Sequence, residues 1–303
     1  MNSSSFRAAL PLAAAMLVLQ WPAAGQTGEE SIRQLWNTQF FQQRPAGKKP
    51  ASARRPVTYR AVGPAAPKPA TVAAGVTDTL LGVTLWRLRK PSTADDPATR
   101  LLVLEEASGD QTELVPERIE VETQLGEGDR VRLTIEVPRT GHLYVIDREL
   151  YTDGSTSPPY LIFPNYTTRP GDNVVAAGRV IEIPDQRDRP NHFRLRRSRP
   201  DQASELLSML ITPEPLPELK IGRRPLRLAE EQYQEWEKKY AVEAERFELA
   251  GGAGQTWTKE EKAAGSSGDS RLTQDDPMPQ TLYRVAAEPG KTILVKLPVR
   301  LKK

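Results

Sequence analysis

An alternation of apolar and polar side chains with a period of two dominates the middle of this chain. From residue 130 to 137, every second residue is apolar: Val131, Leu133, Ile135 and Val137. A β-strand turns successive side chains to opposite faces, so this pattern predicts a strand with one dry and one wet face. Shorter runs of the same kind recur between residues 79 and 212, separated by turn sequences rich in Gly, Asp and Pro. Many short strands with regular turns predict an antiparallel β-sandwich-like domain, which we assign to residues 77–219.

The segment before this domain, residues 26–76, has a different composition. Apolar residues recur in it at helical spacing, which predicts a short amphipathic helix over about 29–42. From residue 44 to 74 the chain consists largely of Pro, Ala, Lys and Arg. Pro-rich sequence favours extended backbone and cannot build a core. We therefore predict a mainly β protein with a flexible, Pro-rich N-terminal arm.

Three further segments follow the domain. Residues 220–250 carry an aromatic stripe at helical spacing: Tyr233, Trp236, Tyr240 and Phe247. The stripe predicts one amphipathic C-terminal helix that packs on the sheet; a partner-binding helix or short coiled coil is the alternative. Residues 251–280 are rich in Gly, Ser and charge, which predicts a flexible linker. Residues 281–303 regain strand character, and we expect these strands to extend the edge of the main sheet.

The first 25 residues have the three-part organisation of a secretory signal peptide. Arg7 is their only charge, an apolar run extends from Ala8 to Leu19, and small residues ending at Gly25 precede a cleavage point before Gln26. The run is too short for a bilayer-spanning helix, which needs about 20 residues. We expect a mature chain that is extracytoplasmic, either periplasmic or secreted, with no stable membrane span. An uncleaved anchor is the alternative.

The composition excludes several chemistries. The chain has no cysteine, which rules out disulfides, thiolate metal sites and a cysteine nucleophile. Its only histidines, His142 and His192, cannot supply three ligands to one metal, and we interpret both as structural. None of the common catalytic motifs occurs, so we predict no enzyme activity, no cofactor and no metal. The alternative is calcium held by Asp147, Glu149 and Asp153, which gather near one turn.

Charge is divided unevenly along the chain. Residues 26–76 carry 8 Lys and Arg against 2 acidic residues, whereas residues 77–218 carry 17 against 24. A basic arm either contacts an anionic surface or remains a solvated linker. No nucleic-acid recognition motif occurs, and nucleic acid is not an expected partner outside the cytoplasm.

Two groups of residues are candidates for a binding surface. Six arginines crowd the segment from residue 187 to 199, among them Arg194, Arg196 and Arg197. Because a planar guanidinium grips carboxylates and phosphates in pairs, the cluster favours an anionic polymer or an acidic envelope protein as partner. The alternative is that these arginines neutralise nearby acids. Tyr151 and Tyr166, flanked by polar turn residues, are the candidate surface aromatics, and core filling is the alternative for aromatics in this region.

Short sequence features occur in a fixed order between about residues 80 and 218. They are Leu125-Gly126-Glu127-Gly128-Asp129-Arg130-Val131, Gly141-His142-Leu143-Tyr144-Val145, Leu161-Ile162-Phe163-Pro164-Asn165, Ala177-Gly178 and Ile181-Glu182-Ile183-Pro184. This order resembles a bacterial family of unknown function, whose members are extracytoplasmic β domains sometimes attached to serine/threonine kinases or caspase-like peptidases. His142 stands where that family has an aromatic residue. The resemblance implies a β-sandwich-like accessory or interaction domain.

A strand-rich domain behind a signal peptide, without a catalytic motif, favours a non-enzymatic binding or interaction module of the bacterial cell envelope. One alternative is a hydrolase of an envelope polymer that relies on carboxylates alone, since paired Asp and Glu residues need neither histidine nor cysteine. Another is a structural envelope protein tethered by its Pro-rich arm. Two carboxylates facing each other in a deep cleft would favour the hydrolase, and a filled core without a cleft would favour binding.

Overall fold

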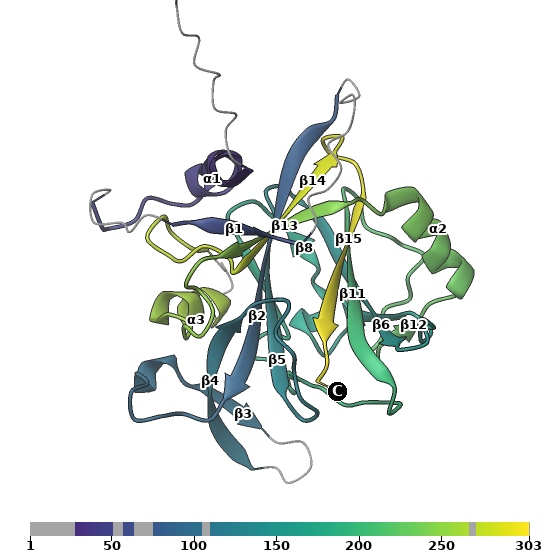
Figure 1. Cartoon of the computed structure of the whole chain (residues 1–303), viewed down its shortest axis with the longest axis horizontal. Coiled ribbons are helices and arrows are strands. Elements are labelled where there is room, and N and C mark those ends of the chain that lie inside the picture. Colours follow the sequence, from purple (N-terminus) through teal and green to yellow (C-terminus); the bar gives the residue numbers. More distant parts are fainter. Residues whose placement is uncertain (1–27, 51–56, 64–74, 105–109, 267–270, 303) are drawn as a thin grey trace, which may run out of the picture.

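The alternating segments fold into two antiparallel sheets that pack face to face, which confirms the predicted mainly β, sandwich-like architecture (Figure 1). The structure is a computed structural model that describes residues 28–50, 57–63, 75–104, 110–266 and 271–302. The predicted signal peptide and much of the Pro-rich arm lie outside the described residues. In the part that is described, no helix has the length and apolar character needed to cross a bilayer.

The described residues contribute nine strands to the first sheet. Its main path runs in the order β1 (Tyr59–Val62), β13 (Ala244–Leu249), β14 (Thr281–Ala287), β2 (Thr77–Arg89), β4 (Gln111–Ile119) and β3 (Leu101–Leu104). A branch leaves β2 through β5 (Arg130–Glu136), which also pairs with β9 (Val180–Ile183) and β10 (Phe193–Arg194). The strand predicted from the alternation at 130–137 is therefore a central strand with three partners.

The second sheet has six strands in the part of the chain that the structure describes. They run in the order β12 (Leu226–Arg227), β7 (Tyr160–Phe163), β6 (Gly141–Tyr151), β11 (Gln202–Thr212) and β15 (Ile293–Arg300), and β8 (Val174–Val175) pairs with β6. The longest contact in this sheet joins β6 to β11, from Thr212 opposite His142 to Gln202 opposite Tyr151.

The core between the sheets follows from the two-residue period. Leu81, Val83 and Leu85 of β2 face inward from the first sheet. Leu207, Met209 and Ile211 of β11 face them from the second sheet, together with alternate residues of β6 and β15. Apolar burial of this extent is the main driving force for joining two sheets.

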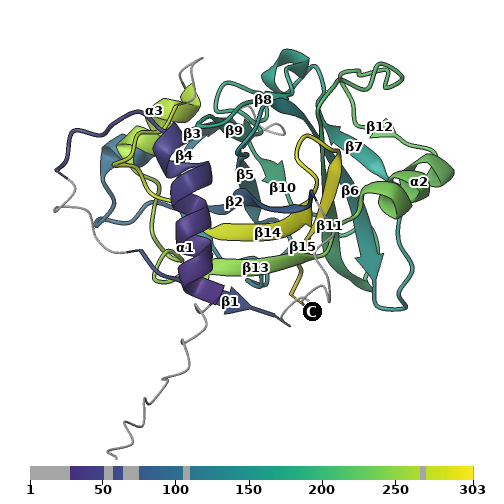
Figure 2. The same cartoon turned by 90° about the horizontal axis from the view of Figure 1, so that it is seen from above.

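Helix α1 (Gly28–Gln39) covers the outer face of the first sheet, where Figure 2 shows it lying across β13 and β14. Its buried residues Ile32 and Trp36 pack with Phe247 and Leu282 of those strands. The short 3-10 helix η1 (Phe41–Gln43) follows. The helix predicted over 29–42 is thus confirmed, and the described part of the arm packs against the sheet.

Helix α2 (Glu230–Tyr240) covers the outer face of the second sheet. Tyr233 and Trp236 pack against Tyr144 and Leu294, which confirms the predicted contact of the aromatic stripe with a sheet. The prediction that the helix continues to residue 250 is wrong, because residues 244–249 form β13. Phe247 fits both the helical spacing and the two-residue period of a strand. The pairing of its segment with β1 and β14 decides in favour of the strand.

The prediction of a flexible linker over 251–280 is wrong for its described residues. Helix α3 (Lys259–Ser266) lies in this segment, and Trp257 and Leu272 are buried beside the first sheet. The segment lies close to two single-turn 3-10 helices, η3 (Pro97–Thr99) and η1, while a third, η4 (Arg169–Gly171), precedes β8. Composition suggested mobility, but a few large apolar residues in the segment suffice to dock it.

The sequence suggested that the two C-terminal strands extend one edge of the main sheet, and the structure shows a different arrangement. β14 lies inside the first sheet between β13 and β2, and β15 forms the edge of the second sheet next to β11. These two consecutive strands therefore belong to different sheets.

Candidate functional site

The inner face of the second sheet changes from apolar to acidic towards one end. On β6, the inward positions Leu143 and Val145 are followed by Asp147 and then Glu149. On β11, Leu207 is preceded at the next inward position by Glu205, which pairs in register with Glu149. Because directly opposed residues of an antiparallel pair share a face, three carboxyl groups gather at this end of the sandwich.

A cavity of about 190 Å³ opens between the sheets at this acidic end. Most of its wall is apolar, and the apolar lining residues are Leu85, Val131, Leu133, Ile162, Phe193, Leu195, Leu207 and Val299. Asp147 and Glu205 also line it, as do Arg194 and Arg196. An apolar pocket with a few convergent polar groups is the usual form of a ligand site.

Asp147 and Glu205 form a carboxyl pair in this cavity. Desolvation raises the pKa of Asp147 to about 7. Desolvation and repulsion by Asp147 raise the pKa of Glu205 to about 8. Gln202 donates a hydrogen bond of 2.7 Å to Glu205 Oε1. Two carboxyls this close titrate as one unit, and near neutral pH the pair retains at least one proton.

The pair lacks partners that would hold it as two carboxylates. Asp147 Oδ1 and Glu205 Oε2 are buried, and the described residues offer them no N–H donor. Within the same residues, no lysine or arginine forms an ion pair with Asp147, Glu149 or Glu205. Instead, Glu149 accepts hydrogen bonds from the Tyr151 and Ser198 hydroxyls. The inner end of the cavity is therefore rich in acceptors and poor in positive charge.

Two exposed arginines lie at the opening of the cavity. Arg194 is on β10, and Arg196 follows two residues later. Neither side chain has a hydrogen-bonding or ionic partner among the described residues. Other arginines of the same cluster do have partners, because Arg187 pairs with Asp185 at 2.9 Å and Arg199 with Asp201 at 2.7 Å. Neutralisation of nearby acids thus accounts for part of the cluster but not for the two arginines at the cavity.

The other candidate surface residues lie apart from the cavity opening. Arg197 is half-buried and donates to the Pro200 carbonyl at 3.2 Å. Tyr166 is 58% exposed and contacts Gly171 in the loop after β7. Tyr151 is only 7% exposed, and the Arg199 guanidinium covers its ring at 3.9 Å. The expectation that Tyr151 lies on the surface is therefore wrong.

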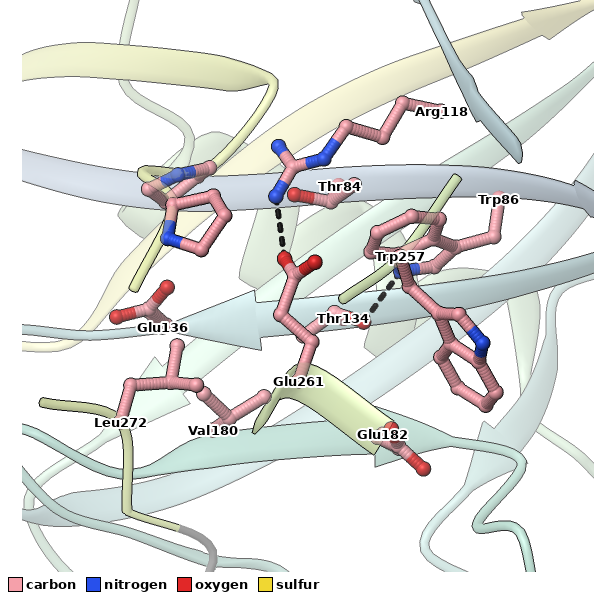
Figure 3. Close-up of a pocket in the computed structure, with 12 residues that line it drawn as sticks. Thr84, Trp86, Arg118, Thr134, Glu136, Val180, Glu182, Trp257, Glu261 and Leu272 are labelled. Atoms are coloured by element: carbon pink, nitrogen blue, oxygen red, sulfur yellow. Dashed lines mark hydrogen bonds and ion pairs between the residues drawn. The ribbon is translucent and has the colours of Figure 1, made fainter. Parts of the chain in front are cut away.

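A second charged pocket lies on the outer face of the first sheet (Figure 3). It leaves about 10 Å³ of free space and is bordered by three buried Arg–Glu pairs. Arg44 pairs with Glu136 at 2.8 Å, and Arg132 pairs with Glu182 at 2.7 Å. The third pair joins Arg118 to Glu261 of α3. This volume is hardly enough for one water molecule, so the pocket is a packing feature and not a ligand site.

These ion pairs attach distant segments to the sheet. Arg44 Nη1 also donates to the carbonyls of Thr273, Asp276 and Pro277. The Arg118 guanidinium lies over the Trp86 ring at 5.0 Å from its centre. Burial raises the pKa of Glu136 although Arg44 opposes the shift. The cluster therefore connects the arm, α3 and the first sheet.

The histidines and the proposed calcium ligands do not join either pocket as a set. His142 Nδ1 lies 3.3 Å from Asn173 Oδ1, and His192 is buried. Asp153 accepts bonds from Ser155 in its own turn, whereas Asp147 points into the cavity. Within the described ranges, no group of three or more His, Asp and Glu is arranged to hold a metal ion.

Reasoning from the sequence missed Glu205 and the pairing of Asp147 with it. The signal is present, because Glu205 continues the inward series Ile211, Met209 and Leu207 by one more step of two. A carboxylate at an inward position contradicts the pattern of a core strand, and such contradictions mark functional sites.

Comparisons with protein-family models, with curated proteins and with solved structures each return no match for this chain.

Proposed function

We propose that this protein is a non-enzymatic, extracytoplasmic binding module of the bacterial cell envelope, and that an anionic group of its ligand binds at Arg194 and Arg196. The observation that carries the proposal is the position of two unpartnered arginines at the opening of a largely apolar cavity. Exposed guanidinium groups that lack ionic partners are suited to a carboxylate or phosphate.

The size of the cavity supports recognition of a small group. A cavity of about 150 Å³ accommodates benzene, so the 190 Å³ found here holds one side group and not a polymer backbone. The ligand therefore inserts a substituent while the rest of it remains outside, near the exposed arginines. A side group of an envelope polymer or of an envelope protein meets this description.

The extracytoplasmic location rests on the sequence of the first 25 residues, and the accessory-domain role on the resemblance to the bacterial β-domain family. Expression of the whole chain in a bacterial host, followed by N-terminal sequencing of the envelope fraction, tests the location. A mature terminus at Gln26 supports the proposal, and an intact cytoplasmic chain contradicts it.

Binding to solubilised peptidoglycan fragments over a range of salt concentrations tests the function. We expect Arg194→Ser/Arg196→Ser to weaken binding at least tenfold at low salt and to flatten its salt dependence. Arg223→Ser/Arg224→Ser removes the same charge from exposed positions on another loop and is the matched control. Equal, salt-independent binding by all three proteins would exclude the arginine site.

A hydrolase that uses Asp147 and Glu205 is a second candidate, and their proximity in one cavity favours it. A proton shared by two carboxyls lets one act as acid and the other as base. Product release from peptidoglycan by the purified protein, abolished by both Asp147→Asn and Glu205→Gln, would replace the binding proposal with this one. Unchanged substrate after long incubation would exclude it for that polymer.

A further inference from the structure

The inner end of the cavity and its opening have opposite electrostatic character. At the inner end, Asp147 and Glu205 present buried oxygens without donors, and Glu149 adds a third carboxylate nearby. At the opening, Arg194 and Arg196 present donors without acceptors. Unsatisfied buried oxygens cost free energy. A ligand that brings hydrogen-bond donors to the inner end therefore gains more binding free energy than one that fills the cavity with hydrocarbon alone.

We propose that the cavity binds a ligand with two charged ends: a protonated primary amine that donates to Asp147 and Glu205, and an anionic group held by Arg194 and Arg196, joined by a short apolar chain. This class comprises ω-amino carboxylates and the side chains of diamino acids. The inference rests on the proposed function, because it keeps the anion at the two arginines and adds a partner for the carboxyl pair.

An ammonium group matches the inner end better than a neutral donor does. It carries three N–H donors on one atom, so it can satisfy both unpartnered oxygens together. Its charge offsets the repulsion between Asp147, Glu205 and Glu149. The surrounding walls are aliphatic or aromatic, and they suit a methylene chain. Leu85, Val131 and Leu133 line the cavity from the first sheet, and Val299 lines it from β15 of the second sheet.

The opening explains why a simple amine is a poor ligand. A cation without an anionic end must pass Arg194 and Arg196, which repel it. A ligand whose carboxylate remains at the arginines and whose amine reaches the acids is attracted at both ends. Specificity for the combination therefore comes from the order of charges along the cavity.

Proton release provides a signature of the amine. The groups that face the carboxyl pair are Glu149 on β6, Gln202 on β11, and Arg194 and Arg196 near β10. Near neutral pH the free pair holds at least one proton, and a bound ammonium favours the doubly ionised form. Binding at pH 6 should therefore release protons, whereas binding at pH 9, where the pair is already ionised, should release almost none.

Calorimetric titration of the full mature chain with 6-aminohexanoate, hexanoate and hexylamine tests the inference. We expect 6-aminohexanoate to bind at least tenfold more tightly than either of the other two. Measurement in buffers of different ionisation enthalpy counts the protons released at pH 6 and at pH 9. Glu205→Gln should weaken binding of 6-aminohexanoate at least tenfold and change that of hexanoate less than twofold.

Glu214→Gln is the matched control, because it makes the same substitution at an exposed position just beyond the other end of β11. It should leave all three affinities unchanged. Asp147→Asn provides a second variant of the pair if Glu205→Gln does not fold. Failure of 6-aminohexanoate to bind, or binding without proton release at pH 6, would overturn the inference. If hexanoate and 6-aminohexanoate bind equally and both lose binding in Arg194→Ser/Arg196→Ser, the inference is overturned but the proposed function stands.

Discussion

The two faces of β2 and β5 border two charged regions with opposite properties. On the outer face, Arg132 and Glu182 pair directly, and the pocket they border has about 10 Å³ of free space. On the inner face, Asp147 and Glu205 lack counter-charges, and the cavity beside them measures about 190 Å³. The same two strands therefore support a closed set of ion pairs on one side and an open, unbalanced set of charges on the other.

This difference separates charges that hold the fold from charges that remain available to a ligand. Burial of an ion costs several kcal/mol, and an ion pair compensates only when its partner is close and well oriented. The outer cluster meets that condition, so it stabilises the docking of the arm and α3. The inner carboxyls have no such partner among the described residues, and a shared proton compensates their charge instead. A ligand can displace that proton.

Breaking an outer ion pair should have the largest effect on stability. Glu182→Ala leaves Arg132 buried without its partner, and we expect the free energy of unfolding to fall by about 3–5 kcal/mol in urea titration. Glu120→Ala removes an acid from the exposed pair with Arg60, where a loss of about 0–1 kcal/mol is expected. Similar losses in the two variants would show that the outer cluster is no stronger than a surface pair.

Neutralising an inner carboxyl should have a smaller effect of the opposite sign. The folded-state pKa of Asp147 lies above its unfolded value, so the native state binds more protons and wild-type stability falls as pH rises from about 4 to 8. Asp147→Asn should flatten this dependence and be more stable than wild type at pH 8, on the order of 2 kcal/mol. Urea titrations at pH 5 and pH 8 measure both slopes, and a wild-type protein that gains stability over this range relative to the variant would contradict the prediction.

Filling the inner cavity should cause the smallest change in stability of the three. Val131→Phe places a larger ring where free space exists, and we expect a loss of stability below about 1 kcal/mol together with loss of 6-aminohexanoate binding. Val83→Phe makes the same change in the closed part of the core, where overpacking costs about 1–3 kcal/mol. Thermal unfolding of the two variants compares them directly, and a greater cost at Val131 would mean that the cavity is not free space.

The sequence predicted strands well where the period of two was long and unbroken, as from Val131 to Ile135. It failed where a short run fits two periods. Phe247 continues the helical spacing of Trp236 and Tyr240, but it also alternates with Arg246 and Glu248 as in a strand. Only the pairing of β13 with its neighbours decides between the two.

The site was accessible from the sequence only in part. The alternation of Arg194 and Arg196 was visible, although β10 ends at Arg194. Their place at a cavity depends on how the two sheets pack together. The outer ion pairs were out of reach, because Arg44 and Glu136 meet only after the arm has docked on the sheet. Pairings between distant segments have no local signature in a single sequence.

Strands β14 and β15 have a consequence for folding. Thr77 of β2 pairs with Ala287 of β14 in one sheet, and Ser204 of β11 pairs with Arg300 of β15 in the other. The segments paired in this way lie far apart in the sequence, and contacts over such long separations form slowly. Until they form, β2 and β11 leave backbone groups unpaired, and exposed strand edges of this kind make folding intermediates prone to aggregate.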